Sequence, residues 1–234
     1  MCGRFVSAQS DGQLQLLFEV DERVGEQLAP SWNVAPTQTV RIIVEETAED
    51  GTPTRQLRNA RWGLLPVWAK DRKMGSRMIN ARSETVTEKP AFRAAATKRR
   101  CVVPADGYYE WQQGERGKVP YYLHAEDAST LAFAGLYELW PDPEIAEDDP
   151  AKWVWTCTIL TRPASDALGH VHDRTPVILP YEMVGDWLDK STRDKSEVAT
   201  LIDAIPEPNL VPRQIGRAVG SPRNNHPGLI EAAG

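Results

Sequence analysis

Cys2 carries the most reactive combination of groups that this sequence offers. Initiator methionine is commonly removed before small residues, and its removal would leave Cys2 with an amine and a thiol on adjacent carbons. An α-amine has an ordinary pKa of about 7.7–8.0, so much of it is nucleophilic near neutral pH. With an aldehyde it forms a Schiff base that the thiolate closes to a thiazolidine, and with an amide it could act as base for its own thiol. The alternative is that Cys2 is a small buried residue of a first strand.

Three short clusters carry groups that could assist such a nucleophile. Asn80 begins the run NARSE, and Glu110 lies in GYYEW, where aromatic neighbours would desolvate the carboxyl and raise its pKa toward acid–base use. His172 begins HDRTP, which places an imidazole two residues before a guanidinium. Each also has a plain interpretation, as a turn asparagine, a strand-end glutamate in a surface ion pair or a surface histidine. Together with Cys2 they supply a nucleophile, an amide donor, an acid and a base.

The charge of the chain is unevenly distributed. The 234 residues have a formal net charge of −6, with 27 Lys and Arg against 33 Asp and Glu. Residues 55–100 hold thirteen Lys and Arg but three Asp and Glu, so this segment carries +10 and the remainder −16. Such a segment is typical of a phosphate-binding face on an acidic body, and a solvated basic face without a partner is the equal alternative.

Several classes of protein are excluded by composition. No apolar run approaches the ~20 residues that span a bilayer, so we expect no membrane partner, and the N-terminus lacks the basic and apolar regions of a secretory signal. The three cysteines, Cys2, Cys101 and Cys157, form no disulfide framework, and no CxxC or HxxxH pair offers a metal cage. We therefore expect a cytoplasmic protein in a reducing environment (associated with the nucleoid if prokaryotic), without a metal or cofactor.

The elements that must position these groups are mainly strands. Apolar runs rich in Val, Ile, Tyr and Trp predict strands at 40–45, 57–65, 101–111, 119–125, 131–140, 154–162 and 175–179. Helical patterning is clearest at 10–19, 90–98, 163–169, 180–189 and 194–204, with Pro90 and Pro180 suited to first-turn positions. Because strands dominate the centre, the pattern predicts an α+β fold with a curved, barrel-like mixed sheet and peripheral helices.

No repeat or linker divides the chain, so we expect a single domain over residues 1–234. The stretch 141–152, PDPEIAEDDPAK, predicts an acidic surface loop between two strands. From Pro206 onward the prolines and the weak periodicity predict an irregular C-terminal tail, 206–234.

These motifs resemble the SOS response-associated peptidase (SRAP) family, whose domain shields abasic sites in DNA. The resemblance runs nearly end to end through MCGRF (1–5), NVAPTQ (33–38), RWGLLPVWAKD (61–71), NARSET (80–85), CVVPADGYYEW (101–111) and HDRTPVIL (172–179). It implies an α+β fold around a barrel-like sheet. It also implies that Cys2 captures the ring-opened abasic aldehyde in single-stranded DNA as a stable thiazolidine crosslink. The family name implies peptidase activity, for which removal of Met1 is the reaction these residues could support.

The resemblance also implies a role for each matched residue. Cys2 is the nucleophile, Asn80 orients the sugar or the Cys2 amine, and Glu110 shuttles protons during Schiff-base formation. His172 helps to open the deoxyribose ring and assists reversal of the crosslink. One departure is Thr175, where a methionine is common after HxR, and it affects local packing more than chemistry.

The DNA-binding residues follow from the same match. Phosphate ligands are expected at Arg4, Arg82 and Arg174, whose guanidinium geometry suits phosphate, and Arg77 of the basic segment is grouped with them. Pro36 and Trp68 fall where the family places wedges against the bases beside the lesion. The expected partner is single-stranded DNA containing abasic sites, bound by a monomer.

Two other functions compete with this interpretation. Class II glutamine amidotransferases also begin with MCG, but they place an Asn-Gly pair in the oxyanion hole. This sequence has no Asn-Gly dipeptide, and Arg4 stands where those chains have an apolar residue. The third possibility is a non-catalytic DNA-binding module that uses the +10 segment alone.

Overall fold

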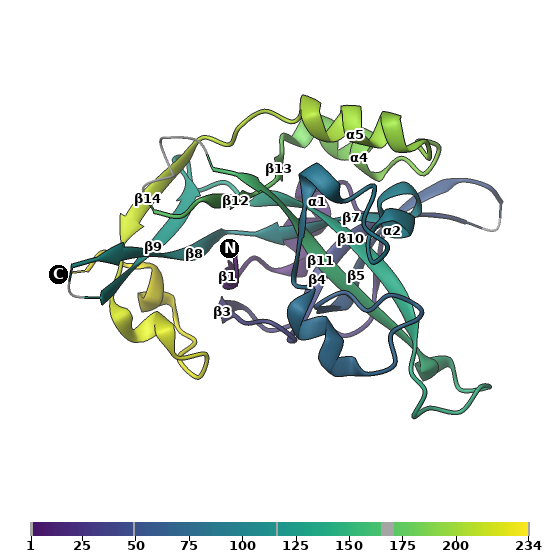
Figure 1. Cartoon of the computed structure of the whole chain (residues 1–234), viewed down its shortest axis with the longest axis horizontal. Helices are drawn as coiled ribbons and strands as arrows, with labels where there is room; N and C mark the ends of the chain where they lie inside the picture. Colours follow the sequence, from purple (N-terminus) through teal and green to yellow (C-terminus); the bar gives the residue numbers. More distant parts are fainter. Residues whose placement is uncertain (1, 49, 116, 165–170, 234) are drawn as a thin grey trace.

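The computed structural model describes residues 2–48, 50–115, 117–164 and 171–233. At its centre five strands close into a barrel in the order β11-β10-β7-β4-β5 and back to β11 (Figure 1). Four of these pairings are antiparallel, and the closing pair β11–β5 is parallel. The barrel strands are β4 (Thr39–Thr47), β5 (Pro53–Trp62), β7 (Arg100–Ala105), β10 (Leu131–Pro141) and β11 (Trp153–Pro163).

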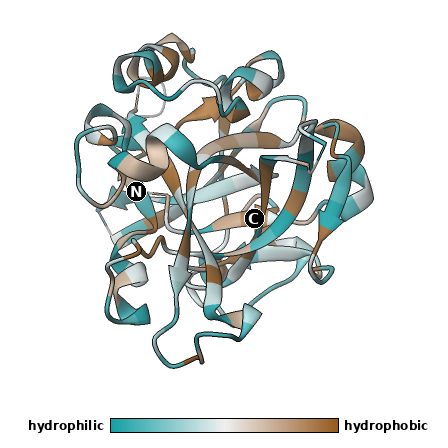
Figure 2. Cartoon of the chain, turned by 90° about the vertical axis from the view of Figure 1, so that its right-hand side faces the viewer, coloured by the Kyte–Doolittle hydropathy of each residue, from teal (hydrophilic) through white to brown (hydrophobic). Residues whose placement is uncertain are grey.

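Along β4 and β10 both faces are largely apolar, because the inside of the barrel is filled with side chains and the outside is covered. Along β4, Ile42 and Val44 belong to the inner core, whereas Ile43 packs in the outer cluster. Along β10 the alternation is the same, with Phe133 inside and Ala134 outside. Side chains that alternate between a filled interior and a covered exterior produce near-continuous hydrophobic runs, and brown residues accordingly mark the strands in Figure 2.

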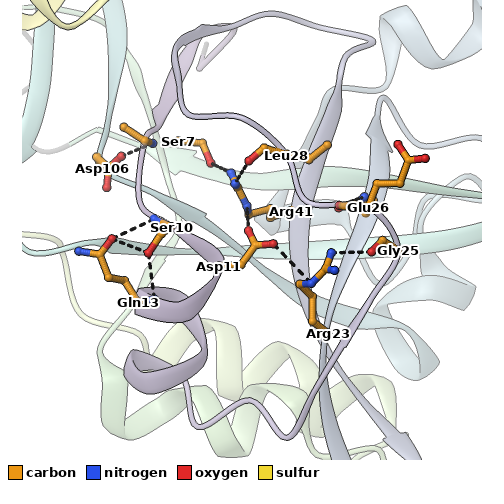
Figure 3. Close-up of polar contacts among 12 residues, drawn as sticks. Ser7, Ser10, Asp11, Gln13, Arg23, Gly25, Glu26, Leu28, Arg41 and Asp106 are labelled. Carbon is orange, nitrogen blue, oxygen red and sulfur yellow. Dashed lines mark hydrogen bonds and ion pairs between the residues drawn. The ribbon is translucent and has the colours of Figure 1, made fainter.

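Short helices cover the outer face of the barrel: α1 (Asp11–Leu17), α2 (Arg93–Lys98), α4 (Val184–Leu188) and α5 (Lys195–Ala204). A capping box begins α1. The Ser10 hydroxyl accepts a hydrogen bond from the backbone N–H of Gln13, and the Gln13 side-chain oxygen accepts one from the backbone N–H of Ser10. A buried ion pair ties this helix to the barrel, since Arg41 of β4 reaches Asp11 through Nε at 2.5 Å (Figure 3). The same guanidinium also binds the Leu28 carbonyl.

A second sheet, in the order β14-β9-β8-β1-β3, brings the chain termini into the fold. Its strands are β1 (Phe5–Ser7), β3 (Ser31–Val34), β8 (Gly107–Gly114), β9 (Gly117–Ala125) and β14 (Leu210–Gln214). The chain passes from the barrel to this sheet at Gly107. A Cβ on Gly107 would lie 2.5 Å from the Tyr122 ring and 2.6 Å from the Leu123 carbonyl oxygen, so this close approach requires glycine.

Short elements complete the structure around these sheets. The strand β2 (Glu22–Val24) pairs with β5, β13 (Ile178–Leu179) with β10, and both β6 (Asn80–Arg82) and β12 (Arg174–Pro176) with β11. The 3-10 turns are η1 (Arg72–Arg77), η2 (Ser83–Thr85), η3 (Pro150–Lys152), η4 (Tyr181–Met183), η5 (Arg217–Gly220) and η6 (Pro227–Ile230). In the described residues, no helix is both long and apolar enough to cross a membrane.

The predicted fold class is confirmed, and so is the loop 141–152, which joins β10 to β11. The single strand predicted at 101–111 is wrong, because Gly107 divides it into β7 and β8 of different sheets. The predicted irregular tail contains β14, since pairing with β9 satisfies its backbone groups.

The predicted helix positions are confirmed in part. Pro90 precedes α2 by three residues, and Pro180 occupies the N-cap of η4, so neither lies in a first helical turn. The helix predicted at 163–169 falls largely outside the described residues, and Pro163 itself ends β11.

Candidate active site

Strand pairing places Cys2 beside the groups predicted to assist it. β1 pairs with β8 through Phe5 opposite Tyr108, so the residues just before β1 run along the strand that carries Glu110. From β6, the Asn80 side chain donates Nδ2–H to the Cys2 carbonyl oxygen at 2.8 Å. The Cys2 side chain is fully buried. Asn80 thus binds the backbone of Cys2 rather than its thiol.

The Glu110 carboxyl lies buried in the same region. Burial raises its pKa, and the nearby His172 opposes that rise. The distance from His172 Nε2 to Glu110 Oε2 is 4.0 Å. Burial also raises the pKa of the Cys2 thiol, and the Glu110 carboxylate adds to this effect. Burial thus shifts both groups toward their neutral forms, and the protonated form of Glu110 is the one that can act as an acid.

His172 has partners suited to either protonation state. Its Nδ1 lies 3.0 Å from the Arg174 amide nitrogen, which donates when Nδ1 carries no proton. The same Nδ1 lies 2.8 Å from an Asp173 carboxylate oxygen, which accepts when Nδ1 is protonated. The His172 side chain is 28% exposed and Asn80 is also half-buried, whereas Cys2 and Glu110 are buried. An imidazole with a partner in each state can take up or release a proton without a large rearrangement.

Arg174 is engaged with protein groups. Its guanidinium forms an ion pair with Glu84 of η2 through two nitrogens and donates to the Thr161 carbonyl oxygen at 2.5 Å. The hydrogen bond from Arg174 lowers the pKa of Glu84 to about 2. The contacts hold the segment bearing His172 against β11 and η2. The structure thus gives Arg174 a structural task, and its role as a phosphate ligand stays a prediction.

The other residues expected to bind DNA differ in how far their side chains are exposed. Arg4 is half-buried, where Nη1 donates to Asn33 Oδ1 at 2.7 Å and to the Val219 carbonyl oxygen at 3.1 Å. Burial lowers the pKa of its guanidinium. The remaining side chains are exposed at Arg77, Arg82 and Trp68 and half-buried at Pro36.

Many cations of the +10 segment are engaged by the protein itself. Six of its thirteen cations bind groups of the protein itself: Arg55, Arg58, Arg61, Arg72, Arg99 and Arg100. Arg100 is buried and donates to main-chain carbonyls at the ends of α2 and α4. Much of the charge therefore holds loops and helix ends in place, and the exposed cations that remain include Arg77 and Arg82.

Tyr108 and Thr175 form a buried pair near the site that the sequence motifs do not predict. The Tyr108 hydroxyl and Thr175 Oγ1 lie 3.0 Å apart, both buried, and burial raises the pKa of Tyr108. The sequence does indicate that Tyr108 lies near the site, because residues two apart in a strand share a face and Glu110 follows Tyr108 by two. Thr175 gives the Tyr108 phenol a hydrogen-bond partner.

A metal centre has no support in the part of the chain that the structure describes. No three His, Cys, Asp or Glu residues gather there in a way that could hold an ion. Cys2, Cys101 and Cys157 are all buried free thiols.

Comparison with known proteins places the chain in a family. The model of the SOS response associated peptidase (SRAP) family matches residues 1–222. The abasic site processing protein YoqW of Bacillus subtilis is 39% identical, over 99% of this chain and 100% of the relative. The abasic site processing protein HMCES of Gallus gallus is 30% identical, over 97% and 76%. A crystal structure of a protein from Bacteroides thetaiotaomicron is similar with a TM-score of 0.82 at 26% identity, over 99% and 100%. The chain belongs to the SRAP family.

Proposed function

We propose that this chain captures abasic sites in single-stranded DNA as a covalent thiazolidine crosslink at Cys2, after removal of Met1. The observation that carries the proposal is the convergence of Asn80, Glu110 and His172 on the second residue of the chain. Relatives named as abasic site processing proteins support the choice of substrate. A single strand is the suitable form, because a sugar without a base can enter a pocket there with no cost of unpairing.

The chemistry balances without an oxidant or a metal. The neutral α-amine of Cys2 adds to the C1′ aldehyde of the opened sugar and gives a carbinolamine. Loss of one water, with a proton supplied to the departing hydroxyl, gives the imine. The thiol sulfur then adds to the imine carbon, its proton passes to the nitrogen, and the five-membered ring closes. The adduct is the sum of protein and DNA minus one water.

Glu110 and His172 have distinct tasks in this sequence of steps. Glu110 is the donor to the departing hydroxyl, because its buried carboxyl keeps its proton to a higher pH than an ordinary glutamate does. His172 reaches solvent and lies 4.0 Å from Glu110, which suits proton exchange during ring opening of the sugar and during reversal. Asn80 holds the Cys2 backbone so that the amine faces the aldehyde.

The test is incubation of the processed protein with an oligonucleotide that contains one abasic site, followed by denaturing electrophoresis. We expect a shifted band with the wild type and none with Cys2→Ala, and mass spectrometry of the adduct should give the sum of protein and DNA minus one water. Cys157→Ala is the matched control, because it removes another buried thiol and should leave the band in place. Absence of the band with the processed wild type would refute the proposal, and glutamine hydrolysis by Cys2 would favour the amidotransferase alternative instead.

A further inference from the structure

Two large apolar side chains are displayed at the tip of a turn between β5 and β6. The Ala69 amide donates to the Pro66 carbonyl oxygen at 2.7 Å, which closes a turn with Val67 and Trp68 at its centre. Val67 is 54% exposed and Trp68 58%, whereas Ala69 next to them is buried. Two adjacent apolar side chains exposed on a closed turn offer a surface suited to stacking against a nucleic-acid base.

The base of this turn is held by the hairpin that β10 and β11 form. Trp140 of β10 donates its indole N–H to the Ala69 carbonyl oxygen at 2.8 Å. Its ring is buried in a small cluster with Leu65 and Ala69. The residue that follows Trp68 is therefore fixed through both its carbonyl and its side chain.

A salt bridge from the acidic loop 141–152 holds the other side of the same segment. Arg72, at the start of η1, donates Nε–H to Asp142 Oδ2 at 2.8 Å and contacts the same oxygen through Nη2. Asp142 is 1% exposed and Arg72 48%, and the guanidinium lies over the Trp140 ring at 5.9 Å. In Figure 1 this hairpin projects at the lower right of the barrel.

We propose that Trp140 and Asp142 are positioning residues that preset Trp68 to stack on a base beside the captured lesion. The inference rests on the proposed function and adds to it the reason for an acidic loop in a DNA-capturing protein. An indole held in its binding orientation loses little conformational freedom on stacking, so the affinity for DNA rises. Asp142 acts through Arg72 and Trp140 through Ala69, and neither needs to touch DNA.

When Asp142 is changed, the electrostatic effect and the positioning effect predict opposite changes in the affinity for DNA. Asp142→Asn removes a negative charge, so electrostatics alone predicts tighter binding of a polyanion. Loss of the salt bridge loosens the Trp68 turn, so positioning predicts weaker binding. Arg72→Gln breaks the same pair while removing a positive charge from a half-exposed site. If positioning dominates, both variants weaken binding, whereas charge alone would move them in opposite directions.

The experiment measures crosslinking rate against protein concentration on an abasic oligonucleotide with normal flanking bases. We expect Trp68→Ala to raise the half-saturating concentration about tenfold, the effect of losing one stacked base. Asp142→Asn and Arg72→Gln should each raise it about three- to tenfold with an unchanged rate at saturation, because the groups around Cys2 are untouched. Asp142→Asn combined with Trp68→Ala should bind no more weakly than Trp68→Ala alone.

Two controls separate position from general damage. Asp148→Asn removes the same charge from an exposed position of the same loop and should bind as tightly as wild type or tighter. On an oligonucleotide whose neighbouring nucleotides also lack bases, wild type and Asp142→Asn should have equal half-saturating concentrations. The inference is overturned if Asp142→Asn matches Asp148→Asn on the base-containing substrate, or if Trp68→Ala binds like wild type. Failure of wild type to crosslink on either substrate would instead refute the proposed function.

Discussion

At the scale of single residues, the chemistry of Cys2 divides between its amine and its thiol. If the amine attacks first and the thiol closes the ring, Cys2→Ser keeps the amine and should still form a Schiff base. Because an imine hydrolyses and an oxazolidine is a weaker trap than a thiazolidine, we expect borohydride to capture a covalent species with Cys2→Ser. Heat or denaturant without the reductant should leave little of it.

A blocked N-terminus provides the control for this experiment. Retention of Met1 or addition of an N-terminal tag leaves the thiol intact but removes the free amine. Both the stable and the reducible adduct should then disappear. A tagged protein that crosslinked as well as the processed one would show that the thiol acts alone, and the thiazolidine mechanism would be wrong.

Glu110 and His172 should be separable by the direction of the reaction. Glu110→Gln should slow crosslinking, because glutamine cannot give a proton to the departing hydroxyl. Since burial raises the pKa of Glu110, the wild-type rate should fall as pH rises through that raised pKa, and Glu110→Gln should lose this limb. His172→Ala should also slow release of a preformed crosslink, measured by transfer to excess unlabelled oligonucleotide. Equal release rates in wild type and His172→Ala would contradict the reversal role.

At the scale of elements, the turn from β7 to β8 decides whether Glu110 reaches the site. Gly107→Ala would push a Cβ against the Tyr122 ring and the Leu123 carbonyl, so we expect a loss of about 1–3 kcal/mol in unfolding free energy. Gly12→Ala is the control, because a Cβ at this exposed helical position meets nothing within 4 Å, and it should stabilise by about 0.4–1 kcal/mol. Denaturant unfolding measures both, and equal values for the two variants would show that the close approach is unimportant.

The ion pair between Glu84 and Arg174 should make stability depend on acid pH. Glu84 has a pKa of about 2 in the folded protein, below its ordinary value, so its stabilisation is complete above about pH 5 and is lost as pH falls toward 2. The carboxylate is 43% exposed, so we expect only about 0.5–1 kcal/mol. The difference in unfolding free energy between wild type and Glu84→Gln should shrink below pH 5. Glu88→Gln, which removes an exposed carboxylate a few residues away, is the matched control.

At the scale of the whole molecule, binding to undamaged single-stranded DNA should depend on few cations. The log of the affinity should fall with log salt by about 0.7 for each phosphate contact. Because Arg82 is exposed, Arg82→Ala should reduce that slope by about 0.7, as measured by fluorescence anisotropy across a salt series. Lys195→Ala on α5 changes the same net charge away from the +10 segment and should leave the slope unchanged. A flat salt response of the wild type would contradict electrostatic binding.

The sequence by itself determined the α+β class, the barrel strands and the choice of Cys2, Asn80, Glu110 and His172 as a possible set. Alternation of apolar residues and the turn residues between them act over a few positions, and these local signals survive in the barrel. The strand at 101–111 was drawn too long because its apolar run continues through Gly107. Only the approach of Tyr122 from β9 shows that the chain must turn there.

The tertiary structure decided which of these residues meet and which cations are free. Asn80 reaches Cys2 across 78 residues because β6 pairs with β11, and the Asn80 side chain then meets the Cys2 carbonyl oxygen. Arg174 is expected from the sequence to bind phosphate and Arg72 belongs to the +10 segment, yet Glu84 binds Arg174 and Asp142 binds Arg72 in the structure. A guanidinium binds carboxylate and phosphate through the same geometry, so its residue type cannot reveal its partner, which only the folding of distant segments brings within reach.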